Sequence, residues 1–392
     1  MAPALASRTG LLKPSPTLAI TAKAKALKAS GRDIIALAAG EPDFNTPEAV
    51  CQAAEDAIRN GFTKYTPTVG IPELRQAVCD MALRENGLRA EPSQVVISCG
   101  AKQSLFNALM VVIEPGDEVL VPAPFWATYE DQVAVAGGTV RRIATTSDSG
   151  FLPSIEQFKE ALGPKTRAIV LNSPNNPTGA VYPRSLLKEI AALAIRHDLW
   201  IIADDIYERL VYNEPHQSIA ALGSEVADRA ITIMGCSKSY AMTGWRIGFA
   251  IAPKRVAEAM GALQDQVTSN PTSFAQVGAL AALRLDASVV EAMRCEFLER
   301  RDLVLDLLRG IEGFKTPVPG GAFYVMPNVE ACLGDRFADD MALAEHLLEH
   351  AGVAIIPGSI FGGPGHIRLS YAASRDDLRE GIARIARALN AP

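Results

Sequence analysis

The sequence predicts an α/β protein whose large domain contains a mainly parallel sheet and whose C-terminal part forms a smaller α+β domain. Its 392 residues exceed what one hydrophobic core usually supports. Short apolar runs rich in β-branched residues, separated mostly by helix-like segments, fill the middle of the chain. This alternation is typical of a buried parallel sheet. After about Asp286 the strands become fewer and the helices longer, which indicates the second domain.

Two helices precede the predicted sheet. Thr46 can cap the first, with Pro47 at its first position and Gly61 closing it. The second helix runs from Pro72 to about residue 86, before Gly87. The predicted strands follow at 94–98, 118–121, 139–143, 167–172, 199–203, 230–234 and 247–251.

The C-terminal part begins with one long amphipathic helix from about residue 286 to 311. We then expect strand 322–326, helix 339–350, strands 353–356 and 366–371, and a last helix that Ser374 can cap and that ends near Leu389. The predicted domains are an N-terminal arm with part of the small domain at 1–45, a large domain at 46–285 and a small domain at 286–392.

Composition disfavours several classes of protein. The formal charge of -6, with both signs interspersed, offers no cationic stripe for nucleic acid or anionic lipid. No apolar run approaches membrane-spanning length, and the N-terminus lacks a signal-peptide pattern. The six cysteines form no C-x-x-C pair and are interpreted as reduced core residues, so we expect no metal site and a cytoplasmic location.

The most informative segment is GCSKSYAMTGWRIG at 235–248, directly after a predicted strand. For a lysine chosen at random, an ordinary surface position is favoured by roughly ten to one. Here, however, Lys238 has suitable neighbours. Ser237 offers a hydroxyl and Arg246 a rigid donor fork for a phosphate, while the lysine amine can form an imine with an aldehyde.

This segment resembles the cofactor-lysine motif of the fold-type I, class I aminotransferases at its lysine, glycine and arginine positions. The resemblance extends from LAAGEPDF at 37–44 to the last helix. It implies pyridoxal 5′-phosphate carried by Lys238 as a Schiff base and ping-pong exchange between an amino acid and a 2-oxo acid. A homodimer with shared active sites is also implied.

Two further motifs end predicted strands. NSPNNPTG at 172–179 is, from its residues alone, a rigid turn. The resemblance implies that Asn176 binds the phenolic oxygen of the cofactor. Asp204 and Asp205 lie at the carboxyl edge of the sheet, where open α/β sheets bind ligands. A buried aspartate needs a partner such as the pyridinium nitrogen. Taken alone, however, the pair could equally be two acids that simply end a strand.

The family spacing selects Asp204, because this aspartate stands three residues before a tyrosine, here Tyr207, which belongs to the same implied site. The small-residue turn CGAKQ at 99–103 precedes a helix whose N-terminus could bind phosphate. By itself, such a turn is weak evidence for a phosphate site. In the family, the corresponding residues are cofactor ligands: Gly100, Ala101 and Lys102.

Aromatic and cationic residues complete the implied site. Trp126 lies where the family stacks an aromatic ring on the pyridine, although a core tryptophan is equally compatible with its burial. Arg368 resembles the family's arginine that binds the substrate α-carboxylate. The alternative is that Arg368 only forms a salt bridge at the edge of a strand. The resemblance also puts Gly40, Trp126 and Asn176 at the substrate, and sends the hydroxyl of Tyr65 to the phosphate bound by the neighbouring subunit.

The substrate is predicted from another resemblance. Lys13, Ser15 and Thr17, with Lys102, resemble the subgroup of aspartate aminotransferases that bind a distal carboxylate through hydroxyls and a lysine. The better-known subgroup uses a partner arginine four residues before an S-N-P turn. Here the turn begins at 269, but the residue four earlier is Asp265.

Aspartate with 2-oxoglutarate is therefore the expected substrate pair. Prephenate, for which Lys13 could bind the second carboxylate, and aromatic amino acids stay open as alternatives. A lyase of the same fold would keep Lys238, Asp204 and Arg368. A transcription factor of this fold would need a DNA-binding module, and the roughly forty residues before the sheet domain are not basic enough for one.

Overall fold

A seven-stranded sheet forms the centre of the large domain in the computed structural model, which describes residues 4–12, 14 and 16–390. The strand order is β2-β8-β7-β6-β5-β3-β4, and β8 is antiparallel to both of its neighbours while the other pairs are parallel. The strands are β2 (Val95–Ser98), β3 (Glu118–Ala123), β4 (Thr139–Ala144), β5 (Thr166–Asn172), β6 (Trp200–Asp204), β7 (Ala230–Gly235) and β8 (Gly248–Ile251). The predicted α/β class and the predicted strands are confirmed.

Each face of this sheet has its own hydrophobic core. Ile201 and Ala203 of β6 belong to one core, and Ile202 between them belongs to the other. Successive side chains of a strand point to opposite faces, so both cores are filled by alternate residues of the same strands. The helices that cover the faces include α3 (Pro72–Asn86), α4 (Ala101–Val112), α5 (Thr128–Val135), α6 (Ile155–Ala161), α7 (Arg184–Arg196), α8 (Ser224–Ala227), α9 (Lys254–Val267) and α10 (Ser273–Leu283).

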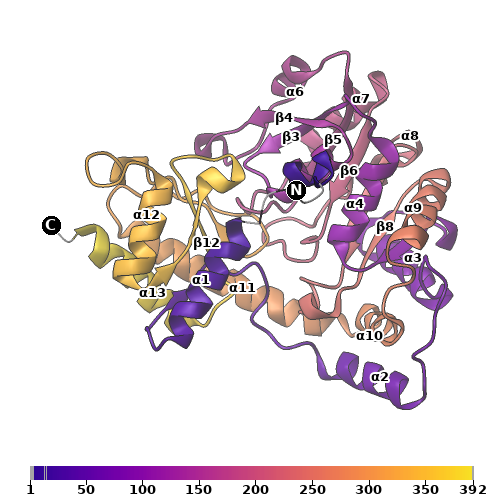
Figure 1. Cartoon of the computed structure of the whole chain (residues 1–392), viewed down its shortest axis with the longest axis horizontal. Coiled ribbons are helices and arrows are strands. Elements are labelled where there is room, and N and C mark those ends of the chain that lie inside the picture. Colours follow the sequence, from indigo (N-terminus) through magenta and orange to yellow (C-terminus); the bar gives the residue numbers. More distant parts are fainter. Residues whose placement is uncertain (1–3, 13, 15, 391–392) are drawn as a thin grey trace.

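The smaller α+β part lies at the other end of the molecule, with α11 (Ala287–Arg309) running between the two ends (Figure 1). Its sheet has the order β11-β12-β9, formed by β11 (Ile356–Pro357), β12 (Ile367–Ser370) and β9 (Tyr324–Val325). Helices α12 (Asp340–His346) and α13 (Arg375–Asn390) pack around it, and Ser374 caps α13 as predicted.

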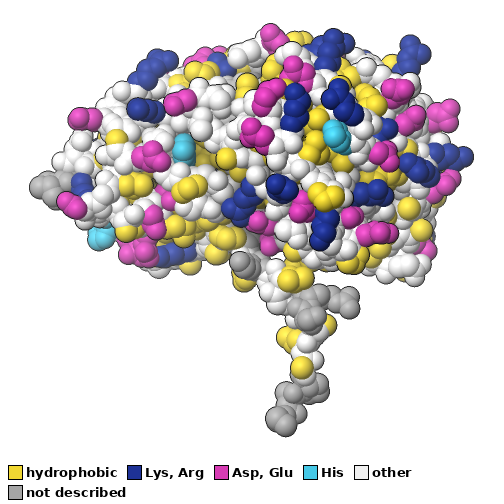
Figure 2. All heavy atoms as spheres, turned by 90° about the horizontal axis from the view of Figure 1, so that it is seen from above, with side chains coloured by type: hydrophobic (Ala, Val, Ile, Leu, Met, Phe, Trp, Pro, Cys, Tyr) yellow, Lys and Arg dark blue, Asp and Glu magenta, His cyan; other side chains and the backbone are white. Residues whose placement is uncertain are grey.

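The segment before residue 46 contacts this smaller part. Strand β1 (Ile35–Ala36) pairs in parallel with β10 (Val353–Ala354), and α1 (Pro16–Ala29) contributes Ala24 to a small core beside them. The arm before α1 stands out from the body (Figure 2), and its described leucines Leu5, Leu11 and Leu12 are exposed. The domain boundaries at 45/46 and 285/286 stay predictions.

Some local predictions are wrong. Thr46 does not cap α2 (Glu48–Arg59), because its hydroxyl accepts a hydrogen bond from Nε1 of Trp245 at 3.0 Å instead, while it donates one to the carbonyl of Ala241 at 2.7 Å. The predicted strand 353–356 is two strands in different sheets, β10 and β11, and the predicted helix 339–350 ends at 346 and continues as a π-helical turn.

The cysteines are only partly core residues. Cys79 and Cys236 are buried, Cys295 is exposed, and the other three are half-buried. The scattered cysteines were therefore wrongly interpreted as a group, because an apolar run in the sequence does not fix which face of a helix a residue occupies. All six are free thiols.

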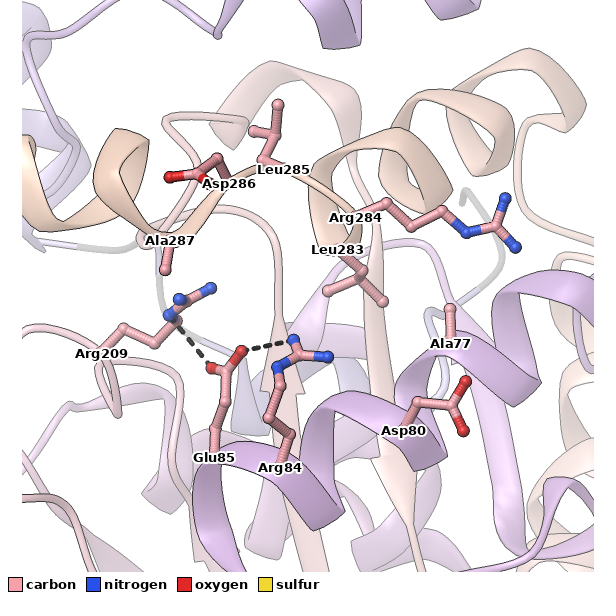
Figure 3. Close-up of a pocket in the computed structure, with 10 residues that line it drawn as sticks. All are labelled: Ala77, Asp80, Arg84, Glu85, Arg209, Leu283, Arg284, Leu285, Asp286 and Ala287. Atoms are coloured by element: carbon pink, nitrogen blue, oxygen red, sulfur yellow. Dashed lines mark hydrogen bonds and ion pairs between the residues drawn. The ribbon is translucent and has the colours of Figure 1, made fainter.

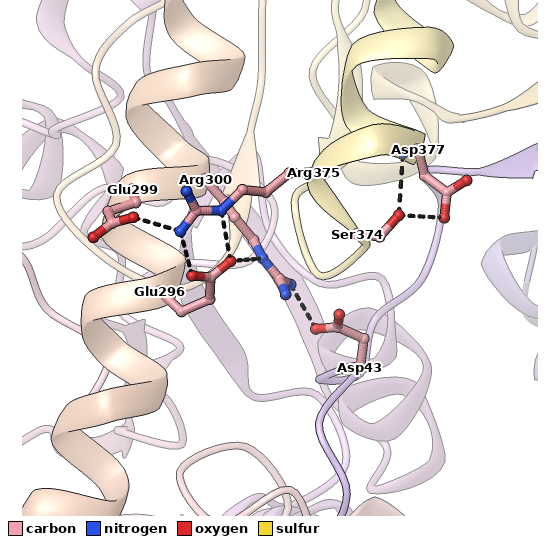
Figure 4. A network of polar contacts seen from close by, with 7 residues as sticks. All are labelled: Asp43, Glu296, Glu299, Arg300, Ser374, Arg375 and Asp377. Atoms are coloured by element: carbon pink, nitrogen blue, oxygen red, sulfur yellow. Dashed lines mark hydrogen bonds and ion pairs between the residues drawn. The ribbon is translucent and has the colours of Figure 1, made fainter.

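A network of ion pairs links three segments of the smaller part (Figure 4). Arg300 of α11, with 7% exposure, binds Asp43 at 2.7 Å and Glu296 at 2.8 Å. Arg375, at the start of α13, binds Glu296 and Glu299. The segment that contains Asp43 is thereby attached to both α11 and α13.

Within the described residues, no single helix is long and apolar enough to cross a membrane. The pair α10 and α11 passes the length and composition test only when taken together, and it is bent by 84°.

Candidate active site

A cavity of about 340 Å³ lies at the carboxyl ends of β5, β6 and β7. The predicted site residues that line it are Thr17, Gly40, Ala101, Lys102, Trp126, Asn176, Asp204, Tyr207, Ser237, Lys238, Arg246 and Arg368. Gly100 lies beside it, next to Arg246. Tyr65 is not among the lining residues and is 90% exposed, while Lys13 and Ser15 lie outside the described residues.

Lys238 lies in the loop between β7 and β8. Its Nζ donates a hydrogen bond to the carbonyl of Gly40 at 2.7 Å. Burial lowers the pKa of Lys238 to about 8, although the charge of Glu41 opposes this effect. A substantial fraction of the amine is therefore neutral near pH 7 to 8, which is the form that can attack a carbonyl.

Asp204 is the last residue of β6 and is 4% exposed. Its Oδ2 accepts a hydrogen bond from the hydroxyl of Tyr129 at 2.7 Å, and its backbone carbonyl accepts one from Asn172 at 2.8 Å. Burial raises the pKa of Asp204 to about 6, and the Tyr129 hydroxyl limits this rise. A carboxylate in this setting is well suited to pair with a cation.

Arg368 lies on β12 and reaches the same cavity from the smaller part. Its Nη1 donates to Oδ1 of Asn176 and its Nη2 to the carbonyl of Ala38, both at 2.8 Å. Its guanidinium lies 4.5 Å from the ring centroid of Tyr324. Among the described atoms, its buried Nε has no hydrogen-bond partner. The guanidinium is thus oriented and keeps an unused donor.

The opposite end of the cavity is cationic. Helix α4 begins after Gly100, which has φ +88° and provides no side-chain cap for the first turn. Arg246, whose φ is +58°, packs against Gly100 so closely that a Cβ there would lie 2.3 Å from Nη2. Lys102 stacks its Nζ over the ring of Trp126 at 4.6 Å. Free helix amides beside two cations form a site for an anion.

Sequence reasoning missed several residues that line this cavity, among them Tyr129, Asn172 and Tyr324. Tyr129 lies three residues after Trp126, a helical spacing that could have indicated a shared face. Asn172 was quoted only as the start of a motif, yet its Oδ1 accepts a hydrogen bond from the backbone of Asn176 at 2.8 Å. Tyr324, whose hydroxyl lies 2.8 Å from that of Tyr207, carries no local signal, because β9 meets the site only through tertiary structure.

The sequence model described as aminotransferase class I and II matches residues 32–385, nearly the whole chain. The chain belongs to this family. As an aminotransferase, it resembles curated relatives over almost its full length. A probable aspartate/prephenate aminotransferase of Aquifex aeolicus is 47% identical over 388 residues, which cover 98% of each chain. The aspartate/prephenate aminotransferase of Thermus thermophilus is 44% identical, with the same coverage.

The fold of this aminotransferase is also found in solved structures. The aspartate aminotransferase from Thermus thermophilus with maleate has a TM-score of 0.94 at 44% identity, covering 99% of this chain and all of that one. The aspartate aminotransferase from Rhizobium meliloti has a TM-score of 0.95 at 41% identity. These likenesses agree with the fold-type I architecture predicted from the Lys238 segment.

Proposed function

We propose that this aminotransferase uses pyridoxal 5′-phosphate to transfer the amino group of L-aspartate to 2-oxoglutarate in a ping-pong reaction. The observation that carries the proposal is the convergence of Lys238, Asp204 and Arg368 on one cavity. These residues come from three different elements and supply an amine, a carboxylate and an oriented guanidinium.

The residues of the cavity fit this cofactor. Among the described lining residues, the basic side chains of Lys102, Lys238, Arg246 and Arg368 outnumber the one carboxylate, that of Asp204. Such an excess favours an anionic ligand, and the cationic end beside α4 suits a phosphate dianion. When bound, pyridoxal phosphate would supply an aldehyde to the Lys238 amine and a ring that withdraws electrons from the substrate.

Lys238 has two roles in this proposal. Its neutral amine would hold the cofactor through the aldehyde, with release of water, until an incoming amino acid takes its place. The freed amine would then take the α-proton of the amino acid and, as an ammonium group, deliver it to the former aldehyde carbon of the cofactor. Asp204 would bind the ring nitrogen, Asn176 and Tyr207 would bind the phenolic oxygen, and Trp126 would pack on one ring face.

The substrate is held by its two carboxylates. Arg368 binds the α-carboxylate in a bidentate pair, for which Nε and one Nη would be available once an Nη leaves its present partner. Lys102 and Thr17 are proposed to bind the distal carboxylate, with Lys13 and Ser15 as further contacts. Asp265 accepts a hydrogen bond from Thr68 at 2.6 Å and has the wrong charge to bind a carboxylate.

The names of two relatives support prephenate as a second substrate. Prephenate also carries two carboxylates, and Lys13 would be an extra contact. For partners, we propose a homodimer in which Tyr65 serves the phosphate of the neighbouring subunit. We also propose a cytoplasmic location, to which the six free thiols are suited.

The test is an absorbance spectrum of the purified protein with added cofactor, followed by half-reactions with aspartate, glutamate, alanine and phenylalanine without oxo acid. We expect a visible band that aspartate discharges fastest, with formation of pyridoxamine phosphate. Absence of the band would overturn the proposal. Discharge only by alanine or phenylalanine would change the substrate, and loss of a β-substituent without pyridoxamine phosphate would indicate a lyase.

A further inference from the structure

Three ionisable side chains are buried behind Asp204 and do not line its cavity. This buried cluster consists of Asp205, Glu208 and His216, whose side chains are almost fully inaccessible. Nε2 of His216 lies 3.1 Å from Oδ2 of Asp205, within ion-pair distance but outside hydrogen-bonding geometry. Asn86 donates a hydrogen bond to Glu208. Buried charges are costly unless they are paired, so the two acids of this cluster need a compensating partner.

The cluster is on the opposite face of the sheet from the cavity. Along β6, Ile201 and Ala203 point to one core and Ile202 to the other. Continuing this alternation, Asp204 shares the face of Ile202 and Asp205 that of Ala203. Asp204 and Asp205 are therefore both buried, with their carboxylates on opposite faces of the sheet. Burial is the main cause of the raised pKa of Asp204, and the charge of Asp205 raises it further.

His216 is the basic group of the cluster. Burial alone would lower the pKa of His216, but the carboxylates of Asp205 and Glu208 more than offset this effect and raise it above the ordinary value. Burial also raises the pKa of Glu208 to about 7. The neighbouring carboxylates thus favour the imidazolium, whose Nε2 faces Oδ2 of Asp205 at 3.1 Å.

The other ionisable groups near the cluster are Glu85, Arg209, Cys236 and Glu291. Glu85 is paired with Arg84 at 2.7 Å and with Arg209 at 3.1 Å (Figure 3). Glu291 is paired with Arg294 at 2.6 Å. Burial raises the pKa of Cys236 to about 12, so its thiol is neutral. Among the described residues, His216 is thus the basic group that lies against Asp205, at 3.1 Å.

A separate cavity borders the cluster. His216 and Glu208 line a separate cavity of about 540 Å³, together with Pro215 and residues of α3 and α11. This cavity neighbours the charged pocket of Figure 3, with which it shares Glu85 and Arg209. Both ring nitrogens of His216 are buried, so we expect this cavity, and not the active site, to be its route for proton exchange with solvent.

We propose that His216 is a positioning residue of the cofactor site, which as an imidazolium balances Asp205 and so keeps Asp204 ionised for the ring nitrogen of the cofactor. The inference rests on the proposed function, because that function assigns Asp204 to the ring nitrogen. It adds a residue that touches neither the cavity nor its ligands.

The first test is the pH titration of the visible absorbance in four cofactor-loaded proteins: wild type, His216→Gln, Asp205→Asn and the double variant. Loss of the buried cation raises the proton affinity of groups around it, so His216→Gln should raise the midpoint by about 0.5 to 1 pH unit. The double variant removes both charges and should return to within about 0.2 unit of the wild type. His197→Gln, at an exposed position after α7, is the control and should leave the midpoint unchanged.

A midpoint in His216→Gln equal to that of the wild type, or a double variant displaced as far as the single one, would overturn the proposal. The second test needs no cofactor. Apoenzyme labelled with ¹³C at histidine Cε1 should show, by NMR, one histidine that titrates above the ordinary value of about 6.5. The His216→Gln spectrum assigns that signal.

The two proposals fail in different ways. If the wild type shows no visible band with the cofactor, the proposed function fails, whatever His216 does. If the wild type shows the band and aspartate discharges it, but His216 is neutral at pH 7 in the apoenzyme, only the role of His216 is wrong.

Discussion

The hydroxyl of Tyr129 is the neutral side chain that binds the carboxylate of Asp204 directly, at 2.7 Å. This hydrogen bond favours the ionised form and limits the rise in the pKa of Asp204, which burial brings to about 6. In Tyr129→Phe the pKa of Asp204 should therefore rise further. Because Asp204 works as a carboxylate, the acid side of the pH profile of kcat/KM should move to higher pH, with about a tenfold loss near pH 6. An acid limb identical to that of the wild type contradicts this role.

Lys238 is the residue on which the proposed chemistry depends. Lys238→Ala should abolish the visible band and lower turnover by at least about 10³-fold, because both the covalent bond and the proton transfer are lost. The matched control is Lys188→Ala, an exposed lysine on α7, which should behave as the wild type. Retention of both band and turnover in Lys238→Ala would show that another group carries the cofactor.

The roles of single residues could be predicted only where they belong to a continuous motif. Lys238, Arg246 and Ser237 lie within one short segment, and Asp204 and Tyr207 within another, so the resemblance assigned them together. Tyr324 and the His216 cluster were missed because their partners lie far away in the sequence. Burial, which sets the pKa of Lys238 and Asp204, is a tertiary property that no single segment contains.

The turn between β2 and α4 shows how an element forms an anion site. Gly100 has φ +88°, and the guanidinium of Arg246 occupies the space that a side chain would need. Gly100→Ala should displace Arg246 and weaken cofactor binding by about 1 to 3 kcal/mol, as measured by titrating the apoenzyme with cofactor. Gly116→Ala is the control, since Gly116 has φ +95° but nothing within 4 Å of the added carbon. Equal losses in both variants would indicate backbone strain alone.

Strands were predicted well where they are buried on both faces. The runs that form β5, β6 and β7 are rich in Ile, Val and Ala up to the carboxyl edge of the sheet, so composition alone predicts these strands. The run 353–356 is equally apolar, yet Ala354 pairs with Ala36 whereas Ile356 pairs with Arg368. Local sequence does not contain this change of partner. Thr46 fails to cap α2 for the same reason, because its hydroxyl binds the distant residues Trp245 and Ala241.

Across the molecule, the arginine network of Figure 4 fixes the segment after Gly40 to α11 and α13. Arg300→Met would leave Asp43 without its partner and should lower the free energy of unfolding by about 2 kcal/mol. Arg309→Met, on the same helix, breaks only an exposed pair with Asp306 and should cost at most about 0.5 kcal/mol. Denaturant unfolding of the two variants measures both losses in the free energy of unfolding. Equal losses would show that Arg300 contributes no more to stability than Arg309.

Tyr65 tests the shared active site of the proposed dimer. Its side chain is 90% exposed in the single chain, which is unusual for a tyrosine without a partner surface. We expect Tyr65→Phe to weaken cofactor binding several-fold while sedimentation still shows a dimer. A mixed dimer of Tyr65→Phe with Lys238→Ala should regain one site of wild-type affinity, because that site combines the intact Lys238 of one chain with the intact Tyr65 of the other. No regained site would mean that Tyr65 acts within its own subunit.

The antiparallel strand β8 has a consequence for how the protein is made. It lies between β2 and β7, so the turn at Gly100 and the loop of Lys238 become neighbours only after β8 has inserted. Residues 95–98 thus pair with residues 248–251, a long separation for which we expect this closure to be a slow, late step of folding. A chain still on the ribosome should not form the cationic end of the cavity until residue 251 has emerged. If the cofactor binds as proposed, its capture would report the completion of the sheet, and truncated chains should be colourless even when their first strands are already folded.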